Sequence, residues 1–243
     1  MTRVGVVTQA RTTSTRLPRK VLLEVAGKTL LDHHLDRLES AGLTVYLATT
    51  VNTADDPLAE LAHARGLEVC RGSEHDVLAR FSECARTHDL DVVVRVTSDC
   101  PLIDGNLVAA GVEEYLAAED PHLYLSNTLQ RTYPRGFDFE IFSRQALLDA
   151  DQHASSPAER EHVTPYLYTD RDGQTGLRQL TRPTDKSGYR VTLDTAEDLE
   201  AIRILIEEHD AAALDVEEII ALLDEHPEIV ALNSNVEQKK LGR

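Results

Sequence analysis

The chain has 243 residues, of which 42% are hydrophobic, enough to bury the core of one large domain. Its 42 acidic residues outnumber its 25 lysines and arginines, and the formal net charge of −17 argues against general nucleic-acid binding. No apolar run approaches the roughly 20 residues that span a bilayer, and the N-terminus lacks the layout of a signal peptide. We therefore expect a single cytoplasmic domain over residues 1–243, without a membrane or nucleic-acid partner.

The first distinctive stretch is a basic loop after a short apolar run. Residues 4–7 are β-branched and apolar apart from one glycine, which predicts a buried strand. The segment 9–20 that follows contains Arg11, Arg16, Arg19 and Lys20, in a chain that is otherwise acidic. Arginine and lysine in this setting suggest an anion site, since they supply forked donors and a mobile charge for phosphate oxygens. A solvated surface loop would explain the charges equally well.

Strand and helix patterns alternate through the first hundred residues. We expect a short extended piece at 21–25 with a turn at Gly27, strands at 44–50, 68–70 and 91–97, and helices at 30–40, 57–65 and over a buried stripe at 77–85. Such alternation implies right-handed crossovers, and hence an α/β fold with a three-layer, Rossmann-like, mostly parallel sheet flanked by helices.

The second half is less regular and predicts a smaller irregular β-hairpin region. We expect helices at 104–116, from Ser156, at 195–209 and at 216–225, strands near Tyr124 and at 137–142, 177–181 and 189–193, and a loosely held tail at 233–243. Asp138 and Glu140 share one face of the strand at 137–142. That face is either exposed to solvent or directed at a ligand, and the solvent-exposed alternative is the commoner one.

Two aspartates at predicted strand ends suggest a metal site. Asp99 follows the valine-rich strand, and Asp194 follows the strand at 189–193. Alone, each is typical of a turn or helix start, but together beside a basic loop they indicate a hard-oxygen site for Mg²⁺ and a phosphate group. The three cysteines, Cys70, Cys84 and Cys100, are widely spaced, and we expect reduced thiols.

Six stretches carry a family resemblance in a fixed order: 9–22, 71–78, 95–102, 133–138, 160–166 and 191–199. Together they resemble the sugar-nucleotide cytidylyltransferases, most closely those of spore-coat polysaccharide biosynthesis, which are related to the enzymes that make CMP-KDO and CMP-sialic acid. The resemblance implies a nucleotide-diphospho-sugar transferase fold. It also implies a nucleotide-binding half at 1–120, an acceptor-binding and metal-completing half at 121–195, and helices and a tail at 196–243.

The resemblance further implies a Mg²⁺-dependent transfer of CMP from CTP to a sugar acid, sugar phosphate or similar anionic acceptor, with release of pyrophosphate by a homodimer. Catalytic roles would fall to Arg11, Arg16, Lys20 and Asp99, and the metal would be held by Asp99 and Asp194. The nucleotide pocket would comprise Ala10, Arg11, Ser14, Arg16, Lys20, Arg71, Ser73, Arg95 and Asp99. The acceptor would be faced by Arg135, Asp138, Glu140, Arg160 and His162.

This sequence departs from the family pattern within the basic loop. Thr12-Thr13 replace the usual Met-Gly, Arg19 replaces a glycine, and Ser98 replaces the usual glycine beside the metal aspartate. Two alternatives therefore stay open: a non-catalytic nucleotide-binding regulatory domain, and a GT-A type glycosyltransferase that consumes a nucleotide sugar.

Overall fold

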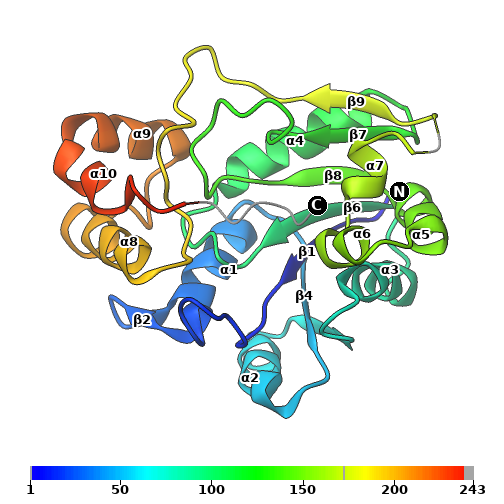
Figure 1. The fold of residues 1–243 in the computed structure, drawn as a ribbon, viewed down its shortest axis with the longest axis horizontal. Helices are drawn as coiled ribbons and strands as arrows, with labels where there is room; N and C mark the ends of the chain where they lie inside the picture. Colours follow the sequence, from blue (N-terminus) through cyan, green and yellow to red (C-terminus); the bar gives the residue numbers. More distant parts are fainter. Residues whose placement is uncertain (1, 172, 238–243) are drawn as a thin grey trace.

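A seven-stranded sheet organises the chain, in a computed structural model that describes residues 2–171 and 173–237 (Figure 1). The strand order is β5-β4-β1-β6-β8-β7-β9. The strands are β1 (Val4–Gln9), β4 (Val45–Thr50), β5 (Glu68–Gly72), β6 (Val92–Thr97), β7 (Leu123–Ser126), β8 (Glu140–Ser143) and β9 (Gly176–Gln179). Strands β5, β4, β1 and β6 are parallel, whereas β8 runs antiparallel to β6 and β7. The predicted mostly parallel α/β sheet is confirmed.

Helices cover both faces of the sheet and form a third group beside it (Figure 1). The first face carries α1 (Leu30–Ser40), α2 (Asp56–Ala64) and α4 (Gly105–Ala117), and the second carries α3 (Val77–Thr87), α5 (Arg144–His153), α6 (Pro157–His162) and α7 (Pro165–Tyr168). The third group is α8 (Ala196–His209), α9 (Val216–Glu225) and α10 (Pro227–Asn233), which share their own apolar cluster. A small antiparallel hairpin, β2 (Glu24–Val25) and β3 (Lys28–Thr29), lies outside the main sheet.

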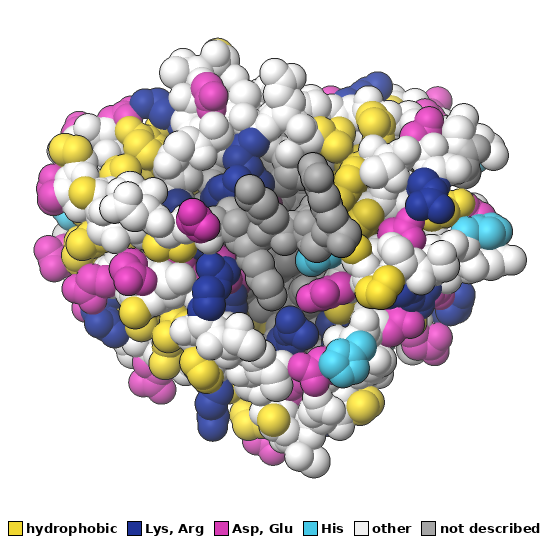
Figure 2. Space-filling model, viewed as in Figure 1, with side chains coloured by type: hydrophobic (Ala, Val, Ile, Leu, Met, Phe, Trp, Pro, Cys, Tyr) yellow, Lys and Arg dark blue, Asp and Glu magenta, His cyan; other side chains and the backbone are white. Residues whose placement is uncertain are grey.

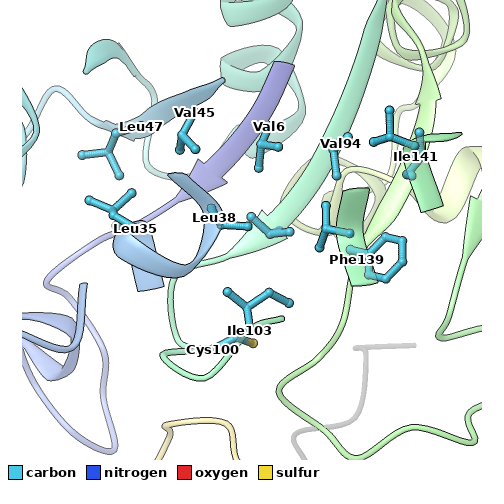
Figure 3. Close-up of a cluster of buried hydrophobic side chains, with 14 of the residues drawn as sticks. Val6, Leu35, Leu38, Val45, Leu47, Val94, Cys100, Ile103, Phe139 and Ile141 are labelled. Carbon is cyan, nitrogen blue, oxygen red and sulfur yellow. The ribbon is translucent and has the colours of Figure 1, made fainter. Parts of the chain in front are cut away.

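The alternation of side chains along the central strands creates the two main cores. Val6 and Val94 face α1, where they lie in one cluster with Leu35 and Leu38 (Figure 3). Their neighbours Val7 and Val93 belong to the opposite cluster, under α3 and α5. Because both faces are covered, most positions of the central strands are apolar on both sides of the sheet.

Side-chain caps explain why several helix starts are readable in the sequence. Ser156, Thr195 and Asp215 each form a capping box with the residue three positions later, as their spacing predicts. Helix α3 begins differently, since Asp76 is its N-cap and accepts a hydrogen bond from the Ala79 amide. Pro165 is the first residue of α7, so it separates this helix from α6.

Some predicted elements differ from the structure. Residues 189–193 form no ladder, only a single bridge between Arg135 and Arg190, so the predicted strand is wrong. The segment 21–25 contains a 3₁₀ turn, Lys20–Leu22, before β2. Helix α10 was not expected, and its last residue, Asn233, is buried rather than loosely held. Residues 238–243 of the predicted loose tail lie outside the described residues.

The prediction that all three cysteines are reduced thiols is also wrong. Cys70 in β5 and Cys84 in α3 form a disulfide, with their Cα atoms 5.5 Å apart, and Cys100 is a buried free thiol. The pairing follows from the fold, because α3 crosses back over β5 and brings two positions 14 residues apart face to face. Within the described ranges, no helix combines the length and apolar composition needed to cross a membrane.

Candidate active site

A pocket of about 260 Å³ lies at the carboxyl ends of β1 and β6, where ligands bind in parallel sheets. Its walls come from the basic loop after β1, the residues that follow β6, the first turns of α3, the end of α6 and Asp194. The lining residues are Gln9, Ala10, Arg11, Thr13, Ser14, Thr15, Arg16, Lys20, Val21, Val77, Arg80, Thr97, Ser98, Asp99, Glu161, His162 and Asp194. Lysine and arginine side chains gather around the middle of this face, next to acidic ones (Figure 2).

Lys20 joins the two aspartates at one end of the pocket. Its Nζ lies 3.0 Å from Oδ2 of Asp99, 2.7 Å from Oδ1 of Asp194 and 2.7 Å from the carbonyl oxygen of Leu193. The structure therefore brings together one cation from the amino-terminal loop and two acids separated by almost a hundred residues. Two carboxylate oxygens converge on a single positively charged atom.

The mutual electrostatics of this group are strong. Burial lowers the pKa of Lys20, but the charges of Asp99 and Asp194 outweigh that effect and leave its pKa above the usual value. For Asp99, burial raises the pKa, and the Lys20 charge with hydrogen bonds from Thr97 and Lys20 leaves it below the usual value. Lys20 and Asp99 are therefore both charged at neutral pH.

Asp194 is held in place by arginines on its other side. Its Oδ2 pairs with Arg16 at 3.1 Å and with Arg190 at 3.0 Å. Arg190 in turn contacts the fully buried carboxylate of Asp198, which also accepts a hydrogen bond from the Asp194 amide. These contacts anchor Asp194 at the start of α8 and orient its carboxylate towards the basic loop.

The basic loop is fixed by residues that replace the usual family pattern. Thr12 is buried, and its amide and hydroxyl both donate to Asp55 Oδ1, at 2.7 and 2.6 Å. Thr13 donates to Glu74. Arg19 has φ = 55° and ψ = 25°, a left-handed conformation that glycine adopts more readily. The backbone shape that a glycine would favour is thus preserved with an arginine side chain.

Arg11 and Ser14 lie at the mouth of the pocket. Arg11 lies 3.7 Å from Glu74 and 4.0 Å from Glu161, and its side chain is largely exposed. The Ser14 hydroxyl accepts a weak hydrogen bond of 3.4 Å from the Leu17 amide. Neither side chain is locked into the protein, so both can contact a ligand in the pocket.

Three residues assigned by resemblance to the nucleotide pocket lie outside its lining. Arg71 donates to the Thr50 and Asn52 carbonyls beside β5, and the Ser73 hydroxyl accepts from the amides that precede α3. Arg95 forms an ion pair with Glu140 inside the sheet. The structure therefore does not bring these three side chains together with Arg11, Lys20 and Asp99.

The residues assigned to the acceptor divide in the same way. His162 lines the pocket. Asp138 is held by both guanidinium nitrogens of Arg131, and Arg160 is held by Asp76 and Asp151. Arg135 is half-buried and contributes its backbone to a bridge with Arg190.

The expectation that Glu140 lies on a face exposed to solvent or directed at a ligand is wrong. It is buried and accepts hydrogen bonds from the hydroxyls of Tyr124 and Thr164 while paired with Arg95. The reason is that β8 lies inside the sheet with helices over both faces, so an alternating polar position meets protein rather than water.

Sequence reasoning missed several pocket residues, chiefly Arg80, Val77, Thr97 and Glu161. Val77 has the sequence pattern of a core residue. Arg80 interrupts an apolar stripe, and this interruption was the signal that could have drawn attention to it. Glu161 and Thr97 lie within recognised stretches, but nothing in their spacing distinguishes them from their neighbours.

The donor set suits a hard divalent cation. Asp99 and Asp194 each direct a carboxylate oxygen at the position occupied by the Lys20 ammonium group, which shows that the site accommodates positive charge between them. Mg²⁺ prefers few protein carboxylates, with waters and substrate phosphates as its other ligands. These two acids therefore fit Mg²⁺, which would take the place of the Lys20 ammonium group between them.

A family model described as cytidylyltransferase matches residues 6–224 of the chain. The chain belongs to the cytidylyltransferase family. A cytidylyltransferase from Leptospira borgpetersenii serovar Hardjo-bovis has a TM-score of 0.90 and 33% identity, over 99% of this chain and 100% of its own. The fold and the family expected from the six sequence stretches are thereby confirmed, and the chain is a nucleotidyltransferase.

Two relatives indicate the range of the family. Spore coat polysaccharide biosynthesis protein SpsF of Bacillus subtilis is 29% identical, over 91% of this chain and 94% of its own length. The 3-deoxy-manno-octulosonate cytidylyltransferase of Solibacter usitatus is 28% identical, over 88% and 90% respectively.

Proposed function

We propose that this cytidylyltransferase transfers CMP from CTP to a sugar acid or similar anionic acceptor, with release of pyrophosphate and with Mg²⁺ as cofactor. One observation carries the proposal: Lys20, Asp99 and Asp194 meet in a pocket that Arg11 and Arg16 also line. Cations and paired carboxylates in one cleft are the groups that displacement at a phosphate requires.

In the proposed reaction, an acceptor oxygen attacks the α-phosphorus of CTP in line. The new bond joins this oxygen to phosphorus, and the bond to the bridging oxygen of the β-phosphate breaks, so pyrophosphate leaves with the electron pair. Arg16 and Lys20 stabilise the charge that develops on the leaving group, and Arg11 helps to position the triphosphate. Asp99 and Asp194 would hold Mg²⁺, which would neutralise phosphate charge when bound.

The acceptor class follows from charge and from the relatives. An attacking carboxylate or phosphate oxygen is already deprotonated at neutral pH and needs no general base, whereas an attacking hydroxyl group of a sugar acid also releases a proton to solvent. His162 and Arg11 line the pocket near the end of α6 and offer donors to such a group. The relative from Solibacter usitatus takes its name from 3-deoxy-manno-octulosonate, a sugar acid, which supports an acceptor of this class.

A screen of CTP, UTP, ATP and GTP against sugar acids, sugar phosphates and phosphonates tests the proposal, with pyrophosphate release as the readout. We expect release only with CTP and an anionic acceptor, and only with divalent cation present. Consumption of a nucleotide sugar without pyrophosphate would favour a glycosyltransferase. Binding of CTP without turnover on any acceptor would favour a regulatory domain.

A further inference from the structure

Arg80 is a buried arginine in the pocket wall that the proposed reaction does not yet use. It lies in α3 and is 3% exposed, and it lines the pocket with Arg11 and Val77. Its Nη1 donates to the Ser73 carbonyl at 3.0 Å. Its buried Nε has no hydrogen-bond partner among the described residues, which is a costly state for a charged group.

The charge of Arg80 is not balanced by the acids around it. Within the described residues, none of the ion pairs involves Arg80, although Asp55, Glu74 and Asp76 are close enough to influence it. Each of these acids has a nearer partner: Thr12 bonds to Asp55, Thr13 to Glu74 and Arg160 to Asp76.

The neighbour of Arg80 across the pocket is another cation. Burial, and after it the positive charge of Arg11, lower the pKa of Arg80 to about 10. Two guanidinium groups held near one another repel, and an anion placed between them would remove that repulsion and replace lost hydration. A pocket with this arrangement favours a negatively charged ligand.

Local structure holds Arg80 in this position. Gly72 ends β5, and a Cβ there would come within 3.3 Å of the Arg80 Cγ, so the absence of a side chain gives the arginine stem room. Val77 and Arg80 are three positions apart and share one face of α3. The Cys70–Cys84 disulfide ties the same helix to β5.

We propose that Arg80 is a nucleotide-binding residue whose guanidinium group, together with Arg11, donates to phosphate oxygens of bound CTP. This inference rests on the proposed function, because it takes CTP as the ligand of the pocket. It adds a buried cation on the α3 side to the arginines and lysine of the basic loop.

Calorimetry with CTP tests the inference in the full-length protein, using R80Q and R80K, with R86Q as the matched control. Arg86 lies on the same helix with a side chain that is 49% exposed. We expect R80Q to weaken CTP binding by about 10- to 100-fold, because a charged hydrogen bond contributes roughly 1.5–3 kcal/mol. R80K should lie between R80Q and wild type, and R86Q should match wild type.

Cytidine provides the comparison without phosphate groups. Its binding is measured by ligand-observed NMR. Its affinity should be equal in wild type and R80Q, and the dependence of CTP affinity on salt should be weaker in R80Q. If R80Q does not fold, the Nε–H signal of Arg80 in wild-type protein, assigned with R80K, serves instead. It should shift on addition of CTP and not of cytidine.

The outcomes separate this inference from the proposed function. Unchanged CTP affinity in folded R80Q, equal losses for CTP and cytidine, or an unresponsive Arg80 signal would each overturn the inference while CTP binding by wild type still stood. Wild-type protein that binds no CTP would overturn both.

Discussion

The ammonium nitrogen of Lys20 lies 2.7 Å from Oδ1 of Asp194, although 174 positions separate the two residues. The same nitrogen contacts Asp99, so one side chain pairs with both proposed metal ligands. Lys20 and a divalent cation therefore compete for the same pair of carboxylates. Binding of a magnesium–nucleotide complex would free Lys20 to contact phosphate.

Replacement of Lys20 by methionine should reveal this competition. We expect K20M to lose most of its turnover, since the leaving pyrophosphate loses a cation, yet to bind Mn²⁺ more tightly in the absence of nucleotide. Titration followed by electron paramagnetic resonance measures the free Mn²⁺ directly. Lys28 pairs with Asp36 on the surface, so K28M is the control. Weaker Mn²⁺ binding by K20M would contradict the competition.

Asp99→Asn should lower the rate of pyrophosphate release by orders of magnitude while the fold survives. The substitution keeps the shape of the side chain but removes one of the two charges proposed to hold Mg²⁺. Asp91, which is exposed at the other end of β6, gives the control variant D91N. The melting temperature of each variant reports the fold. Near-wild-type turnover in D99N would remove Asp99 from the mechanism.

His34 should make the protein less stable in mild acid. Burial lowers its pKa to about 4, and its ring bonds to Thr8 and to the Cys100 carbonyl. The nearby Asp99 charge favours protonation and Arg37 opposes it. The pKa of His34 is lower in the folded state than in the unfolded state, so the folded state binds its proton less readily. The contribution of the neutral, buried His34 to stability is therefore complete above pH 6.5 and is lost as the pH falls towards 4.

The free energy of unfolding should lose about 3 kcal/mol at the acidic limit, because the pKa of His34 is lowered by roughly 2.5 units on folding. Urea unfolding of wild type and H34Q between pH 7 and pH 4.5 checks it. We expect the free energy of unfolding to fall more steeply in wild type than in H34Q, since carboxylate effects are common to both. Parallel pH profiles would exclude His34 as a source of the acid-dependent loss of stability.

Glu140→Gln should destabilise the protein and leave substrate affinity intact. The carboxylate pairs with Arg95 and accepts from Tyr124, whose pKa is raised by burial and by Glu140. Removing the charge leaves the half-buried Arg95 without its acidic partner, at a cost of about 3 kcal/mol. Chemical unfolding measures the loss, and KM for CTP and acceptor in the folded fraction is the control. A raised acceptor KM without a stability loss would instead support the role implied by the family.

Cys70→Ser should cost about 3 kcal/mol of stability, because the disulfide closes a loop of roughly 15 residues. Thiol titration of the denatured protein without reductant should find one thiol in wild type, Cys100, and two in the variant. Addition of reductant should raise the wild-type count to three. Three thiols before reduction would show that the disulfide is not formed in the purified protein.

Most helices and strands could be predicted from the sequence, because apolar spacing and capping residues lie within the elements themselves or next to them. The boundaries of α1 match those predicted, since the apolar spacing and Gly42 mark them. Helices α8 and α9 begin within one residue of their predicted starts, because Thr195 and Asp215 cap them. The segment 189–193 misled because extended, apolar backbone also occurs where a chain runs beside a sheet without pairing.

The site was harder to predict where side chains serve the fold. Arg95, Arg160 and Glu140 carry the residue types of a ligand site, yet each is satisfied by an opposite charge that the tertiary structure brings from another element. Such pairing is invisible in a single sequence. Arg80 was missed for the opposite reason, because no local feature of the sequence shows that its buried Nε finds no hydrogen-bond partner in the part of the chain that the structure describes.

The contact between Asn233 and Asp198 has a consequence for protein synthesis. The Asn233 amide nitrogen bonds to Asp198 and to the Arg190 carbonyl, which support Asp194 from behind. The ribosome must therefore translate α10 before these contacts can support Asp194. A nascent chain therefore exposes its arginine-rich loop long before α10 can support Asp194, so the complete pocket forms only late in synthesis.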